Sequence, residues 1–174
     1  SEGLGFDLPA KRPLMDEWRG MADRVDGVEK EVRIAMVGKY TGLSDSYLSV
    51  IKALQHSSYA VNHKLTIDWI ESANLDDETA DSDPRAHADA WEVLRSVDGI
   101  LVPGGFGRRG IEGKIKAAQY ARTNNVPYLG VCLGLQVATI EFCRNVLGME
   151  GANSTEFEED TPNPAVVFMP EISK

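Results

Sequence analysis

The chain has 174 residues, of which 43% are hydrophobic, and its formal net charge is −9. This length fits one domain of ordinary globular composition. The acidic balance argues against nonspecific binding to nucleic acid or to a membrane surface, because both need a basic footprint. No run approaches the roughly 18 apolar residues of a membrane span, and the first residues lack the basic and apolar regions of a secretory signal.

Residues 1–30 are predicted to form a linker and no part of a sheet. Pro13 can begin a short helix. Three apolar residues then recur at helical spacing: Met15, Trp18 and Met21. We interpret this segment as a linker helix that packs on the domain or on a segment that precedes it. The predicted organisation is therefore a linker over residues 1–30 and one domain over residues 31–174.

Strands and helices alternate along the rest of the chain. Apolar or alternating runs predict strands at residues 32–37, 65–70, 99–102 and 126–130. Helical spacing predicts helices at about residues 45–59, 86–97, 111–123 and 133–147. The acidic stretch 74–84 is predicted to be a solvated surface loop. This order implies an α/β fold with a mostly parallel sheet covered by helices on both faces, in which ligands bind at the carboxyl ends of the strands.

Two predicted strand ends carry the candidate chemistry. The run Gly104-Gly105-Phe106-Gly107 follows one strand, and Gly130-Val131-Cys132-Leu133-Gly134 follows another. The second run has the G-x-nucleophile-x-G form of a nucleophile elbow, whose glycines avoid collisions in a strained turn between strand and helix. The N-terminus of the following helix favours a thiolate. Backbone N–H groups of Leu133 and of the glycine run are predicted to form an oxyanion hole.

The cysteines and histidines leave alternatives open. Cys132 could instead be a small buried residue in a βα turn, and only its pairing with the glycine run favours the nucleophile. Cys143 is predicted to lie in the core. Eleven residues of helix span about 16 Å, which excludes an intrachain disulfide, and two cysteines suggest a reducing compartment. Three histidines precede Cys132, and each is interpreted as structural or solvated: His56, His63 and His87.

The pair Gly38-Lys39 is similar to the end of a phosphate-binding loop, but the residues around it do not fit the motif of such a loop. Tyr40 follows the lysine, where such loops require serine or threonine. Arg33 stands at the position of the required upstream glycine. We therefore do not predict a phosphate loop here.

Four segments resemble, in this order, the glutamine amidotransferase domain of the CTP synthase family: RIAMVGKYTGLSDSYLSVIKAL, VPGGFGRRGIEGKI, PYLGVCLGLQ and NSTEF. The resemblance covers essentially the whole chain. It implies a flavodoxin-like, three-layer class I amidotransferase fold in a cytoplasmic, homotetrameric ligase that makes CTP from UTP, ATP and glutamine in pyrimidine biosynthesis. The amidotransferase domain of this family hydrolyses L-glutamine through a cysteinyl thioester and passes ammonia to a synthetase domain of the same chain. That synthetase domain uses ATP and Mg, the amidotransferase domain holds no cofactor or metal, and GTP is a candidate activator.

The resemblance also assigns roles to individual residues. Cys132 matches the nucleophile, and the backbones of Gly105 and Leu133 match the oxyanion hole. The glutamine-binding positions are Gly105, Leu133, Gly134, Leu135, Gln136 and Glu156. A carboxylate at Glu156 suits the α-ammonium of glutamine, although without the resemblance it would be one more acid in an acidic run. The candidate GTP-linked loop comprises Arg109, Gly110 and Glu112; alternatively, Arg108 and Arg109 form a solvated turn.

The chain departs from the family pattern in two ways. Leu135 stands where many members have methionine, which is a conservative change. The family's triad histidine and glutamate, spaced H-x-E, and a substrate-contacting arginine are expected beyond Lys174, so we expect a domain incomplete at its C-terminus with little or no turnover alone. The alternatives are a noncatalytic regulatory or assembly module of the same fold and, more weakly, a cysteine hydrolase that takes its base from one of the three histidines.

Overall fold

The structure, a computed structural model, describes residues 13–39 and 44–169. The helices in these ranges are α1 (Pro13–Asp26), α2 (Leu48–Ala60), α3 (Asp77–Ser82), α4 (Pro84–Arg95), α5 (Ile111–Asn124) and α6 (Leu133–Asn145). The strands are β1 (Glu31–Gly38), β2 (Lys64–Glu71), β3 (Gly99–Val102), β4 (Tyr128–Gly130), β5 (Asn153–Ser154) and β6 (Pro164–Val166). Short 3₁₀ turns, η1 (Ser44–Tyr47) and η2 (Ser72–Leu75), precede α2 and follow β2.

The central sheet is parallel and has the strand order β2-β1-β3-β4. β1 pairs with β2 on one side and with β3 on the other, so the strand order reverses between β1 and β3. β3 pairs with β4, with Val102 opposite Gly130. Ligands of such sheets bind at the carboxyl ends of the strands beside this reversal. The ends of β1, β3 and β4 therefore form the edge at which a site is expected.

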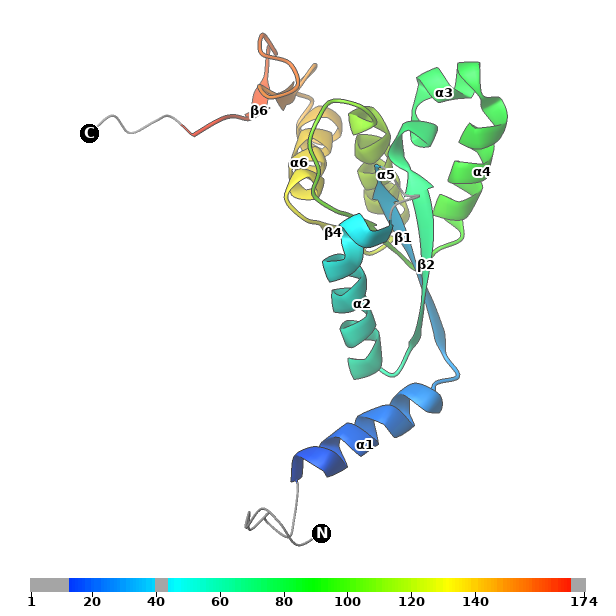
Figure 1. Ribbon diagram of the computed structural model, residues 1–174. Coiled ribbons are helices and arrows are strands. Elements are labelled where there is room, and N and C mark those ends of the chain that lie inside the picture. Colours follow the sequence, from blue (N-terminus) through cyan, green and yellow to red (C-terminus); the bar gives the residue numbers. More distant parts are fainter. Residues whose placement is uncertain (1–12, 40–43, 170–174) are drawn as a thin grey trace, which may run out of the picture.

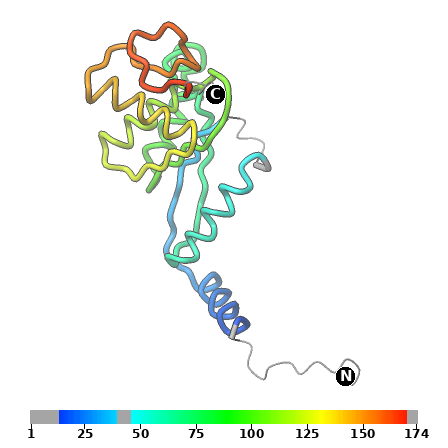
Figure 2. Tube along the Cα trace, turned by 90° about the vertical axis from the view of Figure 1, so that its left-hand side faces the viewer, coloured from blue at the N-terminus to red at the C-terminus, as the bar shows by residue number. Residues whose placement is uncertain are grey.

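Helices cover both faces of the sheet, as predicted. Figure 2 shows β1 and β2 between α2 on one side and the α5–α6 pair on the other. α5 packs against α6, and the rings of Trp91 on α4 and Tyr120 on α5 lie 6.1 Å apart. Strand β3 is buried along its whole length because both of its faces are covered, which explains its continuous apolar sequence.

The predicted acidic loop at residues 74–84 is wrong. The segment forms η2 and α3, and Leu75 is fully buried in the core. Helix α4 begins at Pro84, two residues before its predicted start, because the Asp83 side chain accepts a hydrogen bond from the Ala86 N–H at 3.1 Å. Asp at the N-cap followed by Pro at the first helical position is a favoured helix start. The acidic composition of the segment thus reflects exposed helix surface and a cap.

Helix α1 forms as predicted from Pro13 onward and extends away from the sheet in Figures 1 and 2. Its apolar stripe remains exposed: 51% for Met15, 59% for Trp18 and 37% for Met21. The stripe therefore does not pack on the described domain. No helix in the described part of the chain is long and apolar enough to cross a membrane.

Candidate active site

The carboxyl ends of β3 and β4 bring the glycine run and Cys132 together, as the sequence predicts. The Val131 N–H donates to the Val102 carbonyl at 3.0 Å, which extends the β3–β4 pairing by one residue. A Cβ placed on Gly104 would lie 3.3 Å from Cβ and 3.8 Å from Sγ of Cys132. The glycine run is thus in contact with the cysteine.

The backbone of Cys132 has the strained geometry of a nucleophile elbow. Its φ is 54° and its ψ is −108°, a conformation that residues with side chains rarely adopt. A Cβ on Gly130 would lie 2.4 Å from the Gly134 carbonyl, and one on Gly134 would lie 2.0 Å from the Val102 carbonyl oxygen. The Tyr128 hydroxyl donates to the Gly134 carbonyl at 2.8 Å and fixes the start of α6. Both glycines are therefore required by close backbone contacts.

Cys132 is exposed and stands at the N-cap of α6. Its carbonyl accepts hydrogen bonds from the N–H groups of Leu135 at 3.1 Å and Gln136 at 3.2 Å. Within the described part of the chain, the N–H groups of Leu133 and Gly105 have no recorded acceptor. The leading N–H groups of a helix point outward and bind negative charge. The turn thus presents a thiol beside free backbone donors.

The other predicted glutamine-binding residues lie around this turn or after β5. Gly134 is buried, Leu135 is exposed, and Gln136 is half-buried on the first turn of α6. Glu156 is exposed, and its N–H donates to the Ser154 hydroxyl at 3.2 Å. Its carboxylate has no hydrogen-bond partner recorded among the described residues, and no contact with Cys132 is recorded. The structure thus leaves this carboxylate open to a ligand or to solvent.

The candidate GTP-linked residues line a cavity of about 690 Å³ together with Asp76. Arg109 is exposed, whereas Glu112 forms an ion pair with Arg144 at 2.8 Å. A Cβ on Gly110 would lie 2.3 Å from the Ser72 hydroxyl oxygen, so Gly110 packs closely on η2. Burial raises the pKa of Asp76 to about 6. Glu112 and Gly110 therefore have structural contacts that the sequence did not suggest.

The three histidines do not contact Cys132. His56 is exposed on α2, and Nδ1 of His63 lies 2.7 Å from the Val61 carbonyl oxygen. Nε2 of His87 accepts a hydrogen bond from the Trp91 indole at 3.0 Å. Each thus has a solvated position or a local partner.

Cys143 is half-buried, which is less than the core position predicted for it. Its helix, α6, turns its flanking residue Phe142 outward, with 46% of its surface exposed. Both cysteines are free, as predicted from their separation. Among the described residues, no cluster of His, Cys, Asp or Glu side chains is arranged to hold a metal.

Sequence reasoning missed two buried lysines next to the glycine run. Lys39 follows β1 and is 7% exposed, and Lys114 on the first turn of α5 is 1% exposed. Burial lowers the pKa of both, that of Lys114 to about 8. A signal was available: Lys114 lies three residues after Ile111 and one before Ile115, on the apolar stripe of its helix.

Comparison with known proteins agrees with these features. The profile of the family described as glutamine amidotransferase class-I matches residues 42–165. CTP synthase of Dictyostelium discoideum is 57% identical over 165 residues, which cover 92% of this chain and 29% of that protein. CTP synthase 1 of Homo sapiens is 54% identical over 169 residues, which cover 95% of this chain and 29% of that protein. The chain therefore spans under a third of the length of these curated relatives.

A solved structure of the Trypanosoma brucei CTPS glutaminase domain with bound acivicin shares this fold. Its TM-score is 0.70 at 46% sequence identity, over 79% of this chain and 50% of that one. The predicted α/β fold of a class I amidotransferase is thereby confirmed. Because the family match runs over more than half of the chain and includes both turns of the site, we conclude that the chain belongs to the class-I glutamine amidotransferases.

Proposed function

We propose that this chain supplies the nucleophile and the oxyanion hole of the glutaminase part of a CTP synthase, which hydrolyses L-glutamine through a thioester on Cys132. The observation that carries the proposal is the exposed Cys132 in a strained elbow, beside the free N–H groups of Leu133 and Gly105. Such strain persists at sites where the surrounding structure holds a reactive group in place. The sequence identity with the CTP synthases of Dictyostelium discoideum and Homo sapiens supports the same proposal.

In the proposed reaction, Sγ of Cys132 attacks the carboxamide carbon of glutamine. The N–H groups of Leu133 and Gly105 receive the negative charge that develops on the amide oxygen. The carbon–nitrogen bond then breaks, ammonia leaves with a transferred proton, and a thioester remains. Water attacks the thioester, which releases glutamate and restores the thiol.

The proton-transferring base is proposed to come from outside these 174 residues. Such a base must reach the nucleophile or the leaving group within hydrogen-bonding distance. None of the three histidines contacts Cys132, and Nε2 of His87 is occupied by Trp91. We therefore expect these residues alone to release little glutamate, and a turnover near that of the natural full-length protein would contradict this expectation.

Substrate orientation is proposed to use the first turn of α6 and Glu156. Gly134, Leu135 and Gln136 flank the nucleophile, and the open Glu156 carboxylate suits the α-ammonium group of glutamine. Glu156→Gln is expected to raise the KM for glutamine more than it lowers kcat, because it removes ground-state binding. An effect confined to kcat would contradict this role.

For the whole protein, we propose that the ammonia serves ATP- and Mg-dependent conversion of UTP to CTP by a synthetase domain of the same chain, in a cytoplasmic homotetramer. We also propose that the loop of Arg109, Gly110 and Glu112, which lines the cavity, responds to GTP. These proposals rest on the similarity to CTP synthases alone, because the chain spans only 29% of their length and the structure describes no synthetase domain.

Labelling with a chloroketone analogue of glutamine tests the proposed site. Peptide mass spectrometry is expected to find the adduct on Cys132 and none on Cys143. Cys132→Ser should lose the label, and Cys143→Ser should keep it as the matched control. No adduct on Cys132 would instead favour a noncatalytic module of the same fold.

A further inference from the structure

Two lysines from different elements are buried against the Gly104–Gly107 turn. Lys39 lies just after β1 and Lys114 on the first turn of α5. Buried lysines are rare unless they are paired or used, because desolvating a charge is costly. The mechanism proposed above makes no use of either side chain, so their position needs a reason.

Both side chains reach the turn that carries the proposed oxyanion donor. Nζ of Lys39 donates to the carbonyls of Phe106 at 2.9 Å and Gly107 at 2.5 Å. A Cβ placed on Gly105 would lie 3.9 Å from Nζ of Lys114 and 4.0 Å from Cδ2 of Leu133. The Lys114 ammonium and the Leu133 side chain therefore both approach Gly105 on the side where a Cβ would stand.

The cluster holds two buried lysines and one carboxylate, that of Glu71, whose charge acts on both of them. The Lys39 charge adds to burial in lowering the pKa of Lys114, and Arg109 adds to burial in lowering that of Lys39. Glu71, at the end of β2, opposes both shifts. A space-filling role would not require a charge, since well-packed apolar residues often replace buried ion pairs at no loss of stability. An excess of positive charge in a buried position instead suits a neighbouring group that becomes negative during the reaction.

We propose that Lys114 is a positioning residue for the oxyanion hole, whose ammonium holds the Gly105 peptide opposite Leu133 and favours negative charge on the oxygen bound there. This inference rests on the proposed glutaminase function. It assigns Lys114 no contact with glutamine and no transferred proton. Lys39 fixes the far side of the same turn through the carbonyls of Phe106 and Gly107.

Two reagents separate an effect on the oxyanion hole from an effect on the thiol. A chloroketone analogue of glutamine places its carbonyl oxygen in the hole, whereas iodoacetamide alkylates sulfur by direct displacement without an oxyanion. In the natural full-length protein, Lys114→Met is expected to slow chloroketone labelling of Cys132 and to lower kcat for glutamine by about 10- to 100-fold. The rate of iodoacetamide labelling of the Cys132 peptide should stay within about twofold of the wild type.

Three further variants control for charge and folding. Lys52→Met removes an exposed lysine on α2 and should leave both labelling rates unchanged. Lys114→Gln should repeat the loss seen with methionine, and it keeps the test open if Lys114→Met does not fold. Lys114→Arg keeps the charge and should recover part of the chloroketone rate.

The inference is overturned if a folded, neutral variant at position 114 labels with the chloroketone as fast as the wild type. It is also overturned if the chloroketone and iodoacetamide rates fall together, because Lys114 would then act on the thiol or on the fold. A wild-type protein that does not react with the chloroketone at all would refute the proposed function itself, and this inference with it.

Discussion

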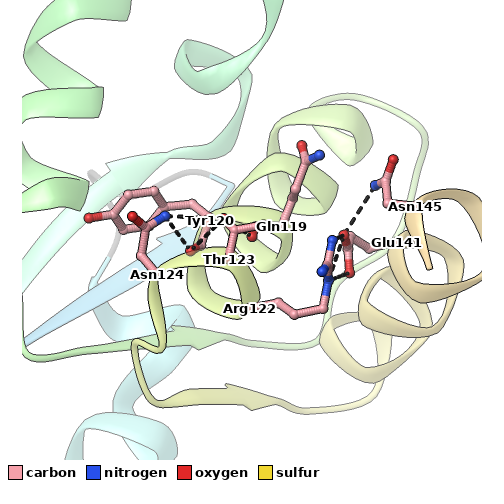
Figure 3. Close-up of polar contacts among 7 residues, drawn as sticks. All are labelled: Gln119, Tyr120, Arg122, Thr123, Asn124, Glu141 and Asn145. Carbon is pink, nitrogen blue, oxygen red and sulfur yellow. Dashed lines mark hydrogen bonds and ion pairs between the residues drawn. The ribbon is translucent and has the colours of Figure 1, made fainter.

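The two ends of the α5–α6 helix pair differ in the charges that lie beside their buried charged side chains. At the C-terminal end, Glu141 is 2% exposed, and Arg122 donates to both of its carboxylate oxygens at 2.7 to 3.1 Å (Figure 3). Asn145 adds a further hydrogen bond at 3.1 Å. At the N-terminal end, Lys114 is equally buried beside a second lysine. At the C-terminal end the buried carboxylate is paired, which stabilises the fold. At the N-terminal end, burying the Lys114 ammonium near the candidate nucleophile costs folding free energy.

The backbone follows the same division. At the N-terminal end, Cys132 has a φ of 54°, and Gly130 and Gly134 make close backbone contacts. Near the other end, Gly148 also has a positive φ, of 68°, but nothing lies within 4 Å of its would-be Cβ. Gly110, just before α5 at the N-terminal end, also combines a positive φ, of 69°, with a would-be Cβ 2.3 Å from the Ser72 hydroxyl oxygen. Positive φ and tight packing thus coincide at the N-terminal end of the helix pair, which is typical of functional turns.

The largest expected effect is that of Gly134→Ala at the N-terminal end. The new methyl would lie 2.0 Å from the Val102 carbonyl oxygen, so α6 must shift away from β3. We expect a loss of about 3 kcal/mol or more in the free energy of unfolding, together with loss of chloroketone labelling at Cys132. Urea denaturation and peptide mass spectrometry measure these two effects. Wild-type stability in this variant would show that the turn is not tightly packed.

A smaller loss is expected from Arg122→Ala at the C-terminal end. It leaves the buried Glu141 carboxylate without its main partner, and an uncompensated buried charge destabilises the fold. Replacing both partners, with Arg122→Met and Glu141→Leu, should recover most of that loss. Arg85→Ala is the control, because the Arg85–Asp89 pair is exposed and contributes little. A double variant as unstable as Arg122→Ala would contradict this explanation.

The variant Lys114→Met should show the energetic cost of burying Lys114, because it changes how the free energy of unfolding depends on pH. The pKa of Lys114 is about 8 in the folded protein against 10.5 in the unfolded chain, so the unfolded chain binds more protons between these values. The wild-type free energy of unfolding should therefore rise with pH across this window, by on the order of 3 kcal/mol. The methionine variant lacks this slope and should be the more stable protein at pH 7. Urea denaturation at pH 7 and pH 10 tests this, and parallel pH profiles would contradict it.

The smallest effect is expected for Gly148→Ala. The methyl meets no atom, so only the left-handed backbone conformation is penalised, by about 1 kcal/mol. Labelling of Cys132 should be unchanged. A loss as large as that of Gly134→Ala would remove the contrast between the two ends. Thermal unfolding of the two alanine variants side by side provides the measurement.

The sequence predicted the parts of the molecule that follow from local pattern. The apolar run of β3 and the glycine framing of Cys132 indicated the parallel sheet and the elbow, because their residue types are required by local backbone geometry. The helical segment α3 was missed because its acidic residues carry no apolar stripe. The burial of Lys39 was missed because it depends on how the end of β1 packs against the glycine turn, which the local sequence does not describe. The position of Lys114 on the apolar stripe of α5 indicated its burial, but not that its ammonium lies beside Gly105.

The most direct test of the central claim is to trap the acyl-enzyme formed from glutamine itself. The natural full-length protein, mixed with radiolabelled glutamine and quenched in acid during turnover, should carry the label on the Cys132 peptide. The label should be released by hydroxylamine, as a thioester is, and it should be absent from Cys132→Ser. Steady release of glutamate with no label on Cys132, or with the label on Cys143, would contradict the claim that Cys132 is the nucleophile.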